Sequence, residues 1–104
     1  REFLHVDDLA AACLLLMEKY EDEVHINVGS QEEISIKDLA VLVKKVVGFE
    51  GEILHDTTKP DGMPRKLMDS SRLRALGWNP TIGLEEGIAS AYKWFLENQE
   101  SFRT

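Results

Sequence analysis

The spacing of apolar positions predicts two amphipathic helices. From residue 36 to residue 47, and again from residue 84 to about residue 98, apolar side chains return every three or four positions, the period of a helix with one buried face. Ser35 offers an N-cap for the first helix, and Gly48 offers a left-handed stop. The apolar positions are Ile36, Leu39, Ala40, Val43, Val46 and Val47 in the first helix, and Leu84, Ile88, Ala91, Tyr92, Phe95 and Leu96 in the second.

A third helix is predicted from Leu9 to Tyr20, where apolar residues leave almost no polar face. Asp7 or Asp8 supplies a carboxylate that suits the N-terminal end of this helix. Such a helix is either internal on every side, or part of its surface lies bare in this chain and is covered by a neighbour that is missing. The residues alone leave both interpretations open.

Alternation of apolar and polar residues predicts short strands between the helices. Val24–Val28 alternates and stops at a Gly-Ser turn, a second strand is predicted over Glu52–His55, and Leu67–Met68 is predicted to be extended. A short helix is predicted over Arg72–Leu76, capped by one of the two serines before it. We expect a small mixed α/β (α+β) domain of three to four helices and two or three short strands, with a fraying tail over Glu97–Thr104.

Length and composition favour one ordinary globular domain over residues 1–104. The chain is 43% apolar and 30% charged, which excludes disordered and fibrous classes. No apolar run approaches the roughly 20 residues that cross a bilayer, so we expect no membrane span. The single cysteine, Cys13, lies in an apolar run, which favours a buried thiol and a reducing, cytoplasmic setting. The chain does not begin with Met, so we expect that it starts inside a longer polypeptide.

Motifs for cofactor and metal binding are not found in this sequence. The seven glycines never fall into the G-x-G-x-x-G or P-loop spacing, so we expect no dinucleotide site in this chain. His5, His25 and His55 lie far apart, which favours structural or surface histidines over a metal site. Trp78 and Trp94 are both interpreted as core residues.

No catalytic residue is predicted either. Asp7 and Asp8 are adjacent at the mouth of a helix, where carboxylates are typical caps. Neither Tyr20 nor Tyr92 has a lysine four residues later, so the tyrosine–lysine pair used for proton transfer by short-chain dehydrogenases is absent at these residues.

The distribution of charge predicts an anion-binding loop. The whole chain has a net charge of −7, but residues 59–74 hold five basic and two acidic residues. A cationic island in an acidic background suits a small anion such as pyrophosphate and disfavours nucleic acid. Arg65 and Lys66 follow a loop that Pro60, Gly62 and Pro64 restrict, which reduces the ordering cost of binding. Arg1 would add a forked donor if folding brings it near. From charge alone, a merely solvated surface loop stays an alternative.

Four segments of this sequence carry a family resemblance: Arg1–Asp8, His25–Gly29, Lys59–Asp69 and Trp94–Asn98. Together they resemble the GDP-L-fucose synthase family of extended short-chain dehydrogenase/reductases, and the resemblance extends over the whole chain. The Lys-Pro-Asp-Gly-x-Pro-Arg-Lys block is the most specific part, whereas the opening motif recurs in many nucleotide-sugar epimerases.

The resemblance implies a fold, a reaction and a binding site. Enzymes of this family convert GDP-4-keto-6-deoxy-D-mannose to GDP-L-fucose by epimerisation at C3 and C5 and reduction at C4 with NADPH. This chain resembles only their smaller C-terminal substrate domain. By resemblance, Arg1 and Lys66 meet the diphosphate of the GDP-sugar, with Arg65 and Asp61 as supporting members of the loop.

The same resemblance implies partners outside this chain. NADP(H) would bind the N-terminal Rossmann domain of the same polypeptide, which is missing here, and the intact enzyme would be a homodimer. We therefore expect the fragment alone to be inactive. Two alternatives stay open: the substrate domain of another enzyme, such as a GDP-mannose 4,6-dehydratase or a UDP-sugar 4-epimerase, and a non-enzymatic adaptor that binds a protein through the apolar helix.

Overall fold

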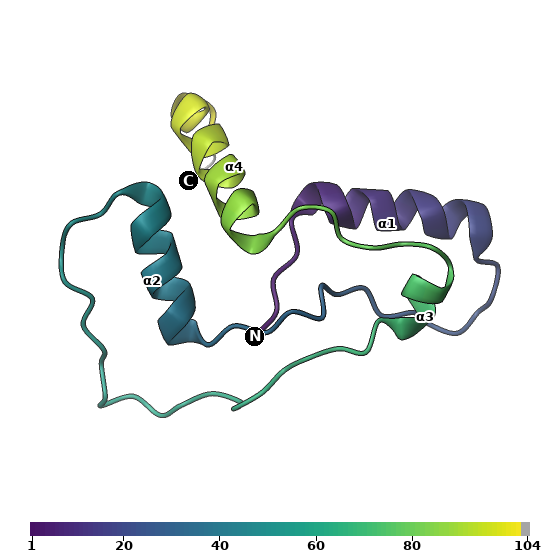
Figure 1. Cartoon of the computed structure of the whole chain (residues 1–104), viewed down its shortest axis with the longest axis horizontal. Coiled ribbons are helices and arrows are strands. Elements are labelled where there is room, and N and C mark those ends of the chain that lie inside the picture. Colours follow the sequence, from purple (N-terminus) through teal and green to yellow (C-terminus); the bar gives the residue numbers. More distant parts are fainter. Residues whose placement is uncertain (103–104) are drawn as a thin grey trace.

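Four α-helices and one short 3-10 helix form the regular structure of residues 1–102, the part of the chain that the computed structural model describes. Figure 1 shows α1 and α3 at one end of the molecule and α2 and α4 at the other, with a long irregular segment joining α2 to α3. The elements are α1 (Val6–Lys19), α2 (Ile36–Val47), α3 (Ser71–Ala75), α4 (Leu84–Glu97) and the 3-10 helix η1 (Gln99–Ser101).

The two amphipathic helices form where the apolar period predicts them. The hydroxyl oxygen of Ser35 accepts a hydrogen bond from the Asp38 backbone N–H at 3.0 Å and caps α2. Gly48 ends α2 with a φ of 73°, which a residue with a side chain adopts only at a cost. An ion pair between Lys45 and Glu85, at 3.0 Å, joins α2 to α4.

The start of α1 differs from the prediction. The helix begins at Val6 rather than at Leu9, and its N-cap is His5, whose Nδ1 accepts from the Asp7 backbone N–H at 3.1 Å. Asp8 is not a cap of α1. It is buried, and its carboxylate accepts hydrogen bonds from Thr81 and Ile82, in the turn that leads to α4. Asp8 therefore joins two segments that are more than seventy residues apart.

The predicted strands are wrong for the described residues, none of which forms a strand. Ile26 and Val28 do pack against the core while Val24 and Asn27 are exposed, so the alternation of Val24–Val28 reports burial of one face. A strand also requires a hydrogen-bonded neighbour, and sequence alternation does not supply one.

Side chains supply some of the hydrogen bonds that a partner strand would otherwise make to this segment. The guanidinium of Arg72 donates to the His25 carbonyl oxygen at 3.1 Å, and the hydroxyl of Tyr20 donates to the Val24 carbonyl oxygen. The segments Glu52–His55 and Leu67–Met68 are likewise irregular. Backbone groups that a sheet would pair are instead held singly.

The start of α3 also corrects a predicted cap. Ser70 occupies the N-cap position of α3 without a cap hydrogen bond from its side chain, and Ser71 is the first residue of the helix. The Asp69 carboxylate accepts from the Ser71 backbone N–H at 2.9 Å instead. Ser70 is fully buried, and its hydroxyl donates to the Gly29 carbonyl oxygen at 3.0 Å. Ser70 thereby ties α3 to the segment between α1 and α2.

The buried core is small and lies between α1 and α3. Ala12, Leu73 and Trp78 are its buried apolar residues. The radius of gyration is 16.7 Å, whereas a compact chain of this length has about 13 Å, so the molecule is open. The partly buried residues around the core are Leu4, Leu15, Leu16, Ile26 and Val28.

Two burial predictions are wrong because the core is one-sided. Cys13 is exposed on α1, and Trp94 is 56% exposed on α4, while Trp78 is buried as predicted. On α1, Leu14 is 64% and Met17 82% exposed, so part of the apolar surface of this helix is bare in this chain.

Most of the described part of the tail that was predicted to fray, residues 97–102, has helical structure. η1 follows α4, and Phe102 packs with ring centroids 6.0 Å from Trp94 and 5.4 Å from Phe95. The rest of the predicted tail, residues 103 and 104, lies outside the described residues. Among residues 1–102, no helix is long and apolar enough to cross a membrane.

Candidate anion-binding site

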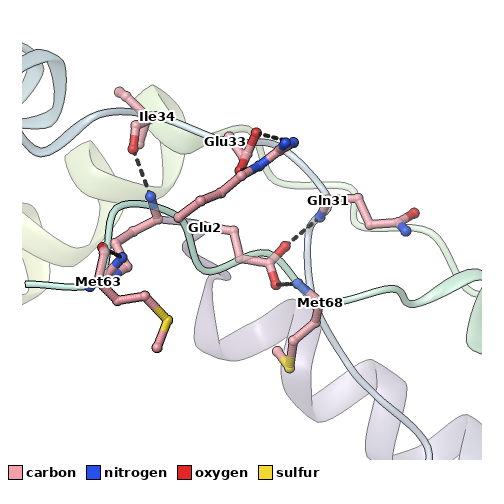
Figure 2. Close-up of polar contacts among 8 residues, drawn as sticks. Glu2, Gln31, Glu33, Ile34, Met63 and Met68 are labelled. Carbon is pink, nitrogen blue, oxygen red and sulfur yellow. Dashed lines mark hydrogen bonds and ion pairs between the residues drawn. The ribbon is translucent and has the colours of Figure 1, made fainter.

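The cationic loop lies against the N-terminal segment. The backbone nitrogen of Arg1 donates to the Ile34 carbonyl oxygen at 3.0 Å, and the Ile34 N–H donates back to the Arg1 carbonyl oxygen at 2.9 Å. From this fixed backbone, Nη1 of Arg1 donates to the Met63 carbonyl oxygen at 2.8 Å. Three segments lie together here, and Figure 2 labels one residue of each: Glu2, Glu33 and Met63.

Arg65 is occupied by a carboxylate. Its Nε lies 2.5 Å from Oε1 of Glu33 and its Nη2 lies 2.8 Å from Oε2, a two-pronged ion pair. The hydrogen bond from Arg65 lowers the pKa of Glu33, and the same bond raises the pKa of Arg65. Arg65 therefore anchors the loop to the segment before α2, and Glu33 neutralises its charge locally.

Lys66 follows Arg65 and projects from the same loop. It is exposed, and no hydrogen bond or ion pair of its side chain is found among residues 1–102. Asp61 is also exposed on this loop, two residues before the Met63 carbonyl that Arg1 contacts. The fold therefore brings Arg1 to the loop that carries the other three predicted site residues.

The approach of Arg1 to the loop does not depend on the glycine at position 62. A Cβ at Gly62 would lie 3.7 Å from Nη2 of Arg1, which is ordinary contact. The approach to the loop begins with a turn in which Asp56 accepts from the Thr58 hydroxyl and N–H. The hydroxyl bond, then the backbone bond, lowers the pKa of Asp56.

Glu2 is one of two site residues that sequence reasoning missed. One of its oxygens accepts from the Gln31 backbone N–H at 2.8 Å, and the other accepts from the Met68 backbone N–H at 3.1 Å (Figure 2). Its neighbour Arg1 was recognised as a cation that could join the site. Nothing near Glu2 in the sequence indicates which backbone N–H groups its carboxylate would contact. Glu33 was missed for the same reason.

The chemistry that this arrangement supports is binding of an anion. Arg1 and Lys66 present cationic donors from a backbone fixed at several points, and such donors form strong bonds to phosphate oxygens. No group of three or more His, Cys, Asp or Glu side chains that could hold a metal ion is present within residues 1–102.

Comparisons with known proteins point to one group of enzymes. No protein-family model matches the chain. GDP-L-fucose synthase 1 of Arabidopsis thaliana is 57% identical over 98 residues, which cover 94% of this chain and 30% of that protein. The crystal structure of a GDP-L-fucose synthetase from Naegleria fowleri superimposes on the whole chain with a TM-score of 0.90 and 32% identity, over 33% of its own length. The resemblance predicted from the sequence is thus confirmed.

A third match concerns the cofactor. MlghC, a GDP-mannoheptose C4 reductase from Campylobacter jejuni, was solved with NADP bound, and it matches 92% of this chain at 39% identity and a TM-score of 0.79. The match covers 31% of that enzyme. The chain therefore spans about a third of the length of the proteins it matches.

Proposed function

We propose that this chain is the substrate-binding part of a GDP-L-fucose synthase, an enzyme that epimerises GDP-4-keto-6-deoxy-D-mannose at C3 and C5 and reduces it at C4 with NADPH. The observation that carries the proposal is 57% identity to such an enzyme across 94% of the chain. The cationic loop, which is the most specific part of the resemblance, lies against Arg1 and is consistent with it.

In this proposal Arg1 and Lys66 bind the diphosphate of the GDP-sugar. Both are cationic, and Lys66 has no competing carboxylate among the described residues. Arg65 supports the loop instead of binding the diphosphate, because its guanidinium is paired with Glu33. Asp61 is a supporting member of the loop, whose backbone Pro60 restricts.

The rest of the reaction is assigned to residues outside this chain. NADP(H) binds an N-terminal Rossmann domain of the same polypeptide, and residues 1–104 form the C-terminal domain. The bare apolar surface of α1, with Leu14 and Met17, is then covered by another part of the enzyme. The intact enzyme is a cytoplasmic homodimer in this proposal, and the 104-residue chain alone does not oxidise NADPH.

The test uses the full-length protein with NADPH and GDP-4-keto-6-deoxy-D-mannose. We expect NADPH consumption and GDP-L-fucose as product. Lys66→Ala is expected to raise the KM for the GDP-sugar at least about tenfold, because a charge-assisted hydrogen bond contributes roughly 1.5–3 kcal/mol. Lys93→Ala, which removes an exposed lysine from α4, is the control. An unchanged KM for Lys66→Ala would contradict the diphosphate role.

The exposed face of α1 favours one rival function, a non-enzymatic protein-interaction module. Calorimetry of the full-length protein with GDP separates the two. No measurable GDP binding, together with retention of a protein partner in a pull-down, would favour the module. Formation of a different nucleotide-sugar product would instead assign the chain to another epimerase or dehydratase.

A further inference from the structure

The segment that carries Lys66 is anchored on both sides of this residue. Before it, the Met63 carbonyl accepts from Arg1 and Arg65 pairs with Glu33. After it, the Met68 N–H donates to Glu2 at 3.1 Å. Lys66 therefore has a free side chain on a backbone that is held one residue before it and two residues after it.

Glu2 links this segment to a second one. Its other carboxylate oxygen accepts from the Gln31 N–H at 2.8 Å, so a single side chain next to Arg1 joins residues 31 and 68 (Figure 2). The packing around this carboxylate is tight, because a Cβ at Gly29 would lie 2.5 Å from Oε1 of Glu2.

We propose that Glu2 is a positioning residue for the diphosphate: its carboxylate fixes the backbone of Lys66 relative to Arg1. The inference rests on the proposed function, since it concerns the same anion site. Glu2 does not itself contact the ligand, because a carboxylate repels a diphosphate.

A carboxylate is the group that this geometry requires. Two backbone N–H groups point at the side chain from different segments, and an ionised carboxylate offers two acceptor oxygens and no donor. Glutamine has the same shape, but its NH₂ group would face one of the two N–H groups. Glu2→Gln therefore releases either residue 31 or residue 68 while changing little volume.

The sign of the effect separates positioning from charge. Removal of a negative charge beside an anion site, taken alone, strengthens anion binding. Loss of the positioning bond weakens it, because Lys66 must then be ordered when the ligand binds. The two explanations thus predict opposite changes in the Kd for GDP.

The experiment measures GDP binding by calorimetry and steady-state kinetics in the full-length enzyme. For Glu2→Gln we expect the Kd for GDP and the KM for the GDP-sugar to rise about tenfold, the value of roughly one hydrogen bond, with kcat within about twofold of the wild type. Glu32→Gln is the control, since Glu32 is an exposed glutamate next to the site residue Glu33. We expect its Kd for GDP to equal or fall slightly below that of the wild type.

A second variant keeps the test valid if Glu2→Gln does not fold. Gly29→Ala displaces the Glu2 carboxylate without changing any charge, and Gly83→Ala is its control, because a Cβ there meets nothing within 4 Å. We expect Gly29→Ala to weaken GDP binding and Gly83→Ala to leave it unchanged.

The outcomes are distinguishable from failure of the proposed function. If the wild-type protein binds no GDP, the proposed function fails. If it does bind GDP, but Glu2→Gln and Gly29→Ala bind GDP as tightly as the wild type or more tightly, the positioning role is overturned.

Discussion

Two regions of this molecule, the core and the cationic loop, are held by different kinds of contact. Between α1 and α3, Leu73 and Trp78 are buried, and the buried carboxylate of Asp8 is satisfied by hydrogen bonds. Around the cationic loop, by contrast, Glu33 and Arg65 form an exposed ion pair, and no residue from 59 to 69 is buried.

This difference separates stability from binding geometry. Burial of apolar surface supplies most of the free energy of folding, whereas exposed polar contacts contribute little net energy because water competes for them. Substitutions in the core should therefore change the free energy of unfolding. Substitutions at the loop should change ligand binding first.

The largest effect is expected from Leu73→Ala, because Leu73 is fully buried in the small core. Removal of a buried leucine side chain costs about 2–5 kcal/mol through lost burial and the cavity that remains. Denaturant unfolding of the full-length protein measures the loss. Leu54→Ala is the matched control, since Leu54 is 80% exposed and its substitution should change stability by less than about 0.5 kcal/mol.

The next effect is expected from Asp8→Asn. The carboxylate accepts from the backbone N–H groups of Thr81 and Ile82 and from the Thr81 hydroxyl, so an amide there leaves a buried donor facing a donor. The expected loss is about 1–3 kcal/mol in the free energy of unfolding. Asp7→Asn, an exposed neighbour, serves as control.

The same residue predicts a dependence of stability on pH. Burial by itself would raise the pKa of Asp8, but the hydrogen bonds from Thr81 and Ile82 outweigh it and lower the pKa below its ordinary 3.8. The unfolded chain then binds the proton more readily than the folded chain. The contribution of Asp8 is complete above about pH 4 and is lost as the pH falls through the lowered pKa. The difference in stability between wild type and Asp8→Asn should therefore shrink below pH 4; a constant difference would contradict this assignment.

Local signals in the sequence predicted the helices well. Ser35 caps the start of α2 and Gly48 ends it, as predicted, and the apolar period gave the position of α4. Cap residues and apolar periodicity depend only on residues that are close in the sequence, so they can be recognised from the sequence alone. The strand over Val24–Val28 failed because a strand depends on a partner elsewhere, and none pairs with it among the described residues.

The candidate site was predictable as a charge pattern but not as a set of contacts. Lys66 and Arg65 were recognised from their unusual surroundings and from the family resemblance. That Arg65 would pair with Glu33, or that Glu2 would reach Gln31 and Met68, depends on contacts across 29 to 66 residues of sequence. Asp8 is a similar case. A carboxylate before an apolar run is interpreted as a helix cap unless its distant partner, here Thr81, is known.

The smallest effect on stability is expected from Glu33→Gln, which breaks the ion pair with Arg65. Both groups face water, so the melting temperature should stay close to that of the wild type, and any small loss should disappear in high salt, where charges are screened. Melting curves of the full-length protein at low and high salt, with Glu32→Gln as control, measure this. A loss as large as that of Asp8→Asn would contradict the comparison, because it would mean that the loop contributes to stability on the scale of the buried core. A small loss combined with a changed Kd for GDP would support it, because the loop contacts would then determine binding geometry rather than stability.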